Sequence, residues 1–158
     1  MKETDNFDAV ATTRKLLCEA TSVALATVMP QSGAPFASLI TLATEPDGSP
    51  ICLLSDLAVH CANLRAEPRA SIMIEERDCD DPLQGARISL SGILTATDDP
   101  AARACFLDRY PDARSYCDFT DFKFYRLALE TVHLVAGFGR IVDLPANMVL
   151  QSPNPAME

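Results

Sequence analysis

The chain has 158 residues, of which 48% are hydrophobic and 22% charged, the composition of an ordinary globular protein. Its formal net charge of -9 and its pI near 4.6 argue against an electrostatic grip on DNA, RNA or an anionic membrane. The length suits one domain, which we expect to occupy residues 1–158.

Cysteine usage and the start of the chain bear on the cellular compartment. None of the six cysteines forms a CxxC pair and only two histidines are present, so we predict no metal site. The opening MKETDNFDAV lacks the basic and apolar regions of a secretory signal, and the apolar runs are too short to span a bilayer. These features predict a cytoplasmic protein with free thiols.

The first half of the chain reads as one helix followed by strands. Apolar side chains of residues 7–20 fall near one helical face, which predicts an N-terminal helix within residues 1–20. The runs SVALATVM (22–29) and FASLITLATE (36–45) are strand-like and are separated by the turn-rich PQSGAP. PDGSP suits a hairpin turn into a third strand, ICLLS (51–55).

The second half continues mainly as strands. RASIMIEE (69–76) and ARISLSGILTAT (86–97) are the next two, and Gly92 within the latter predicts a bulge or sharp bend. Asp99 as N-cap and Pro100 at the first helical position predict a helix. Residues 122–144 read as one bent strand or as two strands broken at Gly137-Phe138-Gly139. The proline-containing segment 145–158 is predicted to be a loose tail.

These elements predict a mainly β (α+β) fold. Six or so strands in hairpin succession with few helices between them favour an antiparallel six-stranded barrel with peripheral helices. The chain has neither a βαβ rhythm nor a GxGxxG motif, so a doubly wound dinucleotide-binding sheet is not expected.

The stretch LLSDLAVHCANLRAEPRA passes from a strand into polar sequence without a glycine or proline before the helix. If residues 57–66 are helical, Ser55 or Asp56 is the N-cap, and His60 and Asn63 share a face near that end. The free N–H groups and helix dipole there favour a phosphate. The alternative is that Ser55 only caps the helix and His60 is a half-buried helix residue.

A family resemblance bears on this choice. The run PFASLITLATEPDGSPICLLSDLAVHCANLRAEPRASIMI resembles the flavin-binding split barrels of the pyridoxamine 5′-phosphate oxidase-like superfamily, and within it the heme-utilization (HugZ-like) branch. DPLQGARISLSG and HLVAGFGRI are similar to later signatures of that branch. The resemblance implies an FMN-binding split barrel, an FMN-dependent oxidoreductase acting on a small molecule, and a homodimer with the flavin at the subunit interface.

The resemblance also implies a role for particular residues. Those on the second strand would lie along the isoalloxazine ring, those after the third strand would surround the FMN phosphate, and two arginines would come from the partner chain. In that order the residues are Ser38, Leu39 and Ile40; Ser55, His60 and Asn63; Arg87 and Arg140. The alternatives are plain strand packing for the first group and solvated or ion-paired side chains for the arginines.

Two departures from the oxidases of the superfamily are visible. At the positions where those oxidases carry an Arg-Lys pair, this chain has His60 and Cys61. These two side chains offer a phosphate less positive charge. Their C-terminal Trp and Arg-Leu-x-Pro segment has no counterpart here, so we do not expect pyridoxamine phosphate oxidation. No catalytic acid or base is assigned.

Two other functions stay open. The same barrel can be a heme-binding or heme-degrading protein, with His60 or His133 as the residue whose substitution removes the heme spectrum. The alternative for His133 is a partly buried strand residue with a hydrogen-bond partner. It can also be a cofactor-free dimeric binding module.

Overall fold

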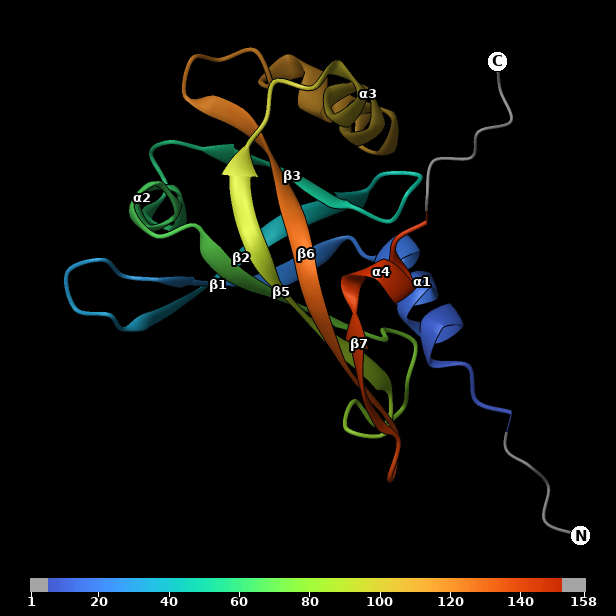
Figure 1. The fold of residues 1–158 in the computed structure, drawn as a ribbon. Helices are drawn as coiled ribbons and strands as arrows, with labels where there is room; N and C mark the ends of the chain where they lie inside the picture. Colours follow the sequence, from blue (N-terminus) through green and yellow to red (C-terminus); the bar gives the residue numbers. More distant parts are fainter. Residues whose placement is uncertain (1–5, 152–158) are drawn as a thin grey trace, which may run out of the picture.

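The structure is a computed structural model that describes residues 6–151. It consists of one antiparallel sheet, shown in Figure 1, with short helices around it. The strands are β1 (Ser22–Val28), β2 (Pro35–Thr44), β3 (Pro50–Ser55), β4 (Arg69–Glu75), β5 (Ala86–Ala96), β6 (Phe122–Ala136) and β7 (Ile141–Pro145). The helices are α1 (Ala9–Glu19), α2 (Val59–Ala66), α3 (Pro100–Arg109), a 3-10 turn at Pro111–Ser115, and α4 (Ala146–Val149).

The sheet closes into a barrel because β6 is long enough to pair with three strands. One edge of β6 pairs with β5. The opposite edge pairs with β3 over residues 122–126 and with β7 over residues 131–135. The closed circuit is therefore β1–β2–β3–β6–β5–β4, with β7 added outside it. This confirms the predicted six-stranded antiparallel barrel, and Figure 1 shows β6 running its full height.

Side chains alternate along the strands between the barrel interior and the outer face, as the two-residue period of a strand requires. The interior is filled by aliphatic side chains from every barrel strand, such as Leu25, Ile72 and Leu90, each with no exposed surface. Leu16 and Leu17 of α1 join the same cluster. A second, smaller cluster packs α3 against β3 and β6.

Gly92 marks the bulge that the sequence predicted. The register of β5 against β6 shifts between Ser91 and Gly92, so that Ser91 lies opposite Thr131 and Gly92 opposite Leu129. Glu130 is therefore the extra residue on β6. A Cβ atom at position 92 would lie 2.2 Å from the Ala128 carbonyl oxygen, which explains why glycine stands there.

The helix predictions are confirmed in their main points, with one error at the C-terminal end. The helix predicted over 7–20 spans Ala9–Glu19, and Asp99 caps α3 through its side chain, which accepts from the Ala101 N–H. The loose tail predicted from residue 145 is wrong up to residue 150. Pro145 ends β7, α4 follows, and Val149 is fully buried. Arg14 Nε of α1 donates to the Val149 carbonyl at 3.0 Å, a long-range bond that the sequence did not indicate. Residues 1–5 and 152–158 of these predictions lie outside the described residues.

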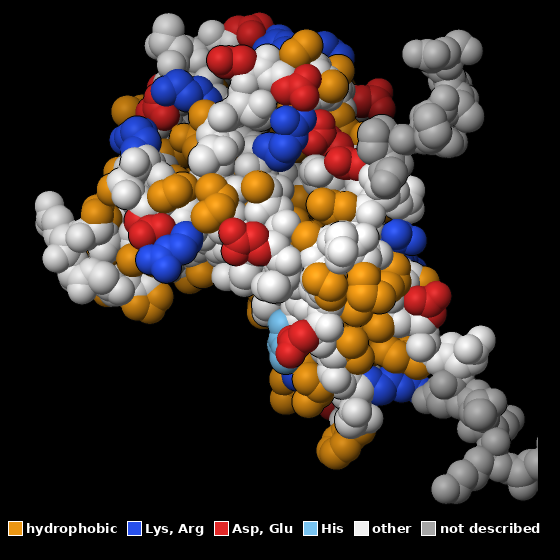
Figure 2. All heavy atoms as spheres, viewed as in Figure 1, with side chains coloured by type: hydrophobic (Ala, Val, Ile, Leu, Met, Phe, Trp, Pro, Cys, Tyr) orange, Lys and Arg blue, Asp and Glu red, His pale blue; other side chains and the backbone are white. Residues whose placement is uncertain are grey.

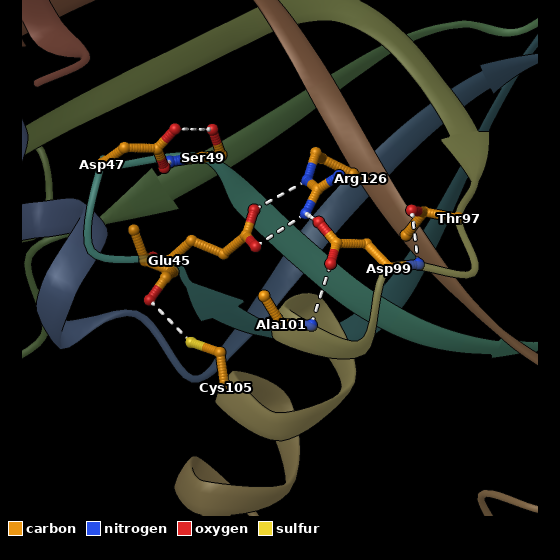
Figure 3. Close-up of polar contacts among 9 residues, drawn as sticks. Glu45, Asp47, Ser49, Thr97, Asp99, Ala101, Cys105 and Arg126 are labelled. Carbon is orange, nitrogen blue, oxygen red and sulfur yellow. Dashed lines mark hydrogen bonds and ion pairs between the residues drawn. The ribbon is translucent and has the colours of Figure 1, made fainter. Parts of the chain in front are cut away.

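A charged network ties the β2–β3 turn to β6 and α3 (Figure 3). Arg126 makes two hydrogen bonds of 2.7 Å to the Glu45 carboxylate and one of 2.7 Å to Asp99 Oδ2. The three residues come from segments far apart in the sequence. Arg126 therefore clamps the end of the barrel next to α3.

Among residues 6–151, no helix is long and apolar enough to cross a membrane.

Candidate functional site

A hollow opens where β2 and β3 separate. The two strands pair only over residues 42–44 and 50–52, whereas the other edge of β3 stays paired with β6 from residue 51 to residue 55. The resulting hollow has a volume of about 290 Å³ and is lined from β2, β3 and the start of α2. Four predicted site residues meet there: Leu39, Ile40, Ser55 and His60.

His60 is half-buried at the edge of this hollow. Its Nδ1 shares a hydrogen bond of 3.1 Å with Ser38 Oγ, which brings a fifth predicted residue into contact with the group. Burial lowers the pKa of His60 from its ordinary value, so the imidazole is uncharged at neutral pH. His60 can therefore donate or accept one hydrogen bond in the hollow but adds no positive charge.

The start of α2 differs from the prediction. The helix begins at Val59 with Ala58 as N-cap and no side-chain cap, so the predicted N-cap at Ser55 or Asp56 is wrong. Ser55 Oγ instead accepts from the Leu57 N–H at 3.2 Å and donates to Asp121 Oδ2 at 2.7 Å. The reason is that the chain makes a turn at residues 55–58 before the helix, in which Ala58 N–H donates to the Ser55 carbonyl.

Asn63 is not brought into the hollow. Its side chain is 3% exposed, and its amide nitrogen donates to Thr27 Oγ1 on β1 at 3.0 Å. This bond satisfies a buried polar group and fastens α2 to the barrel wall. Asn63 therefore holds the helix in place, whereas His60, one turn earlier, faces the hollow.

A second cluster lies on the outer face of the sheet, at β5, β6 and β7. His133 of β6 is half-exposed, and its Nδ1–H donates to Asp143 Oδ1 of β7 at 2.6 Å. Ser89 of β5 lies directly opposite His133, and Met73 of β4 lies opposite Ser89. Because Asp143 occupies Nδ1, Nε2 is the ring nitrogen of His133 that can meet a ligand.

The two predicted arginines lie away from the hollow. Arg87 of β5 pairs with Val135 and is therefore a diagonal neighbour of His133 on the outer face, roughly 7–8 Å away across the strands. One of its nitrogens donates to the Leu83 carbonyl at 3.1 Å. Arg140 lies in the β6–β7 turn with its guanidinium 4.8 Å from the centre of the Phe7 ring. Within a single chain, Arg87 therefore shares a surface with His133 and not with His60.

Sequence reasoning missed two aspartates that decide the chemistry of these clusters. Asp143 had a usable signal, since a hairpin centred on Phe138 places residue 143 opposite residue 133. Asp121 had none. It reaches Ser55 through the pairing of β3 with β6, two strands separated by more than sixty residues of chain.

Residues 4–148 match the CREG β-barrel family. Among curated proteins, the chloroplastic non-canonical heme oxygenase HOZ of Arabidopsis thaliana is 39% identical over 108 residues, covering 66% of this chain and 33% of that protein. Among solved structures, a heme-binding protein from Mycobacterium smegmatis is 33% identical with a TM-score of 0.83, covering 90% of this chain and 60% of that one. The chain thus spans a third of the first relative and three fifths of the second.

A more distant likeness concerns the fold alone. A putative pyridoxamine 5′-phosphate oxidase from Listeria innocua superposes with a TM-score of 0.64 at 17% identity, covering 85% of this chain and 98% of that one. The barrel predicted from the oxidase-like resemblance is therefore confirmed as a fold.

Proposed function

Because the chain belongs to the CREG β-barrel family, and because relatives at 39% and 33% identity are a heme oxygenase and a heme-binding protein, we propose that it binds heme. The observation that carries the proposal within this chain is the hydrogen bond of 2.6 Å between His133 Nδ1 and the Asp143 carboxylate. Histidines that ligate metals usually donate their second ring N–H to a carboxylate, carbonyl or water, which fixes the orientation of the ring.

The surroundings of His133 suit a porphyrin. Its strand neighbours on the outer face are Ser89, Thr131 and Val135, and the small Ser89 and Thr131 leave room over the sheet on one side of the ring. Arg87, the diagonal neighbour, would hold a propionate, because a guanidinium binds carboxylates through paired hydrogen bonds. Bound heme would supply a redox-active iron whose reactivity depends on its axial ligand and on the polarity around it. This chain would contribute the ligand through His133 and its orientation through Asp143.

Titration of the purified protein with hemin tests the proposal. We expect a Soret band that is shifted from that of free hemin. His133→Ala should remove this shift and lower the affinity for hemin, since the imidazole that would hold the iron would be gone. Asp143→Asn should weaken hemin binding by about tenfold, as the loss of a carboxylate that orients a ligating histidine does at other metal sites. The measurement is the Soret absorption as a function of hemin concentration.

His60→Ala is the matched control, because His60 is the other histidine and lies at the hollow. It should leave the Soret shift intact. A shift lost in His60→Ala and retained in His133→Ala would contradict the assignment to His133. The absence of any Soret shift with the wild-type protein would remove the heme proposal altogether.

We also propose that the protein is a homodimer joined through the outer face. Exposed apolar side chains there include Leu39 at 74%, Met73 at 45% and Ile141 at 64%. Figure 2 shows hydrophobic side chains gathered over β7 and α4. Large exposed apolar side chains on one face of a sheet favour an interaction site, and a stable interface buries about 800 Å² on each partner. A second copy would cover the face that carries His133. That Arg87 and Arg140 of one chain contribute to the cofactor site of the other stays a prediction.

Sedimentation velocity measures the oligomeric state. The wild-type chain is expected to sediment at twice its own mass, and Met73→Glu combined with Ile141→Glu should shift it to a monomer, because two charges would be buried in each half of the interface. Leu83→Glu, at an exposed loop position, is the matched control and should leave the dimer intact. A wild-type monomer at all concentrations would contradict the proposal.

Flavin binding is the second candidate function. It is favoured by the hollow beside the open edge of β2, where Leu39, Ile40 and His60 surround a space next to unpaired strand backbone. A planar ring could lie there against the strand, and an oxidoreductase activity would follow from whichever cofactor binds. Titration with FMN and riboflavin tests this function. Whether the corner between β3 and α2 accepts the FMN phosphate is a separate question.

A further inference from the structure

We infer that Asp121 serves as a built-in anion at the corner where β3 meets α2, and that it makes the hollow at His60 reject the phosphorylated form of any ligand that it can hold. The inference goes beyond heme binding, because it concerns a different cavity and a different chemical group. It concerns the selection between a phosphorylated compound and its unphosphorylated parent.

The Asp121 carboxylate accepts the hydrogen bond of the Ser55 hydroxyl, which a bound phosphate would need as a donor. Ser55 Oγ donates to Asp121 Oδ2 at 2.7 Å, and a hydroxyl has a single proton to donate. The backbone holds Asp121 in place, since the Asp56 N–H donates to the Asp121 carbonyl at 2.6 Å. Ser55 pairs with Phe122 at the end of the β3–β6 pairing, so Asp121 is the residue directly before that pair. Displacing the carboxylate would therefore disturb this end of the barrel wall.

The two cations at this corner share one carboxylate, that of Asp56. Lys123 Nζ lies 2.9 Å from Asp56 Oδ2, and Arg65 Nη1 lies 3.2 Å from Asp56 Oδ1. The corner thus holds two carboxylates and two cations, and both cations bind the same carboxylate. A phosphate monoester, with a charge of about -1.5 to -2 at neutral pH, would meet no unpaired cation among these residues.

The other residues of the predicted phosphate site, His60 and Asn63, do not replace the donors and cations that Asp121 and Asp56 already bind. Burial keeps His60 uncharged at neutral pH by lowering its pKa, and Asn63 donates to Thr27 inside the wall. The backbone N–H groups at the start of α2 are the donors left, and a short helix provides them with only a weak positive field. The hollow itself has a volume of about 290 Å³ and stays open, so we expect it to prefer an uncharged ligand to a phosphorylated one.

Paired titrations with FMN and riboflavin test the inference, because the two ligands share a ring and ribityl chain and differ by the phosphate. For the wild-type protein, quenching of flavin fluorescence should show FMN binding no tighter than riboflavin. Asp121→Asn removes the charge with little change of shape, and FMN affinity should rise at least about tenfold, while riboflavin affinity stays the same. Asp121→Ser is a second variant in case the first folds poorly, with circular dichroism to check folding.

Two controls separate the local effect from the change in net charge. Asp112→Asn alters the net charge by the same amount at an exposed position of the 3-10 turn and should leave both affinities unchanged. Adding Ser55→Ala to Asp121→Asn should abolish the gain in FMN affinity if the released hydroxyl binds the phosphate. Wild-type protein that binds FMN at least tenfold more tightly than riboflavin would overturn the inference, as would folded Asp121 variants without a gain. The hemin Soret shift of Asp121→Asn reports separately on the proposed heme site and is expected to be unchanged.

Discussion

Gly92→Ala is expected to lower the free energy of unfolding by about 4 kcal/mol or more, a large part of the stability of a domain of this size. The added Cβ would lie 2.2 Å from the Ala128 carbonyl oxygen and 3.2 Å from the Leu129 Cα. Overpacking of side chains usually costs about 1–3 kcal/mol, because rotamers can adjust. Here the obstacle is backbone within the barrel wall, so β5 and β6 would have to separate at their bulge.

Urea denaturation followed by circular dichroism measures the effect. Gly33→Ala is the matched control, because Gly33 has a positive φ of 72° but nothing within 4 Å of its added Cβ. It should cost only about 1 kcal/mol, the strain of a left-handed alanine. Equal losses in the two variants would show that the close approach at position 92 contributes nothing beyond backbone conformation.

The bulge illustrates what the sequence could predict. A glycine inside an alternating strand indicates a local irregularity, and strand period, turn residues and the Asp99-Pro100 helix start are all local signals. These signals were sufficient to predict every strand of the barrel and the antiparallel order in which the strands follow one another. They do not indicate that β6 pairs with three different strands, because closure depends on how far the sheet twists over its full width.

The candidate site was predictable only in part, for the same reason. The hollow gathers Leu39 and Ile40, which the family resemblance implied beside the flavin ring, with Ser55 and His60, which it implied around the phosphate. The orientation of each polar side chain depends on partners from distant strands. Asn63 faces Thr27 of β1, and Ser55 faces Asp121 just before β6. A pattern such as S-x4-H-x2-N gives the spacing of its residues but says nothing of these competing partners.

Arg126→Met is expected to lower the free energy of unfolding by about 2 kcal/mol. Methionine keeps the apolar stem but leaves Glu45, whose side chain is 10% exposed, without either of its two hydrogen bonds from the guanidinium. Breaking a fully buried ion pair costs about 3–5 kcal/mol, and the 31% exposure of Arg126 reduces that figure through solvent screening. Arg103→Met is the matched control, since its pair with Asp118 is largely exposed, and it should have a much smaller effect.

The same clamp predicts an acid dependence of stability. The hydrogen bond from Arg126, with a smaller contribution from the Ala101 N–H, lowers the pKa of Asp99 from its ordinary value. A carboxyl group with a lower pKa in the folded state stabilises the fold above its unfolded pKa of about 4, and this stabilisation is lost as the pH falls through the folded-state value. Wild-type protein should therefore lose more stability than Arg126→Met between neutral pH and pH values below about 4. Thermal melting of both proteins across that range measures the difference, and parallel curves would mean that Arg126 does not act through Asp99.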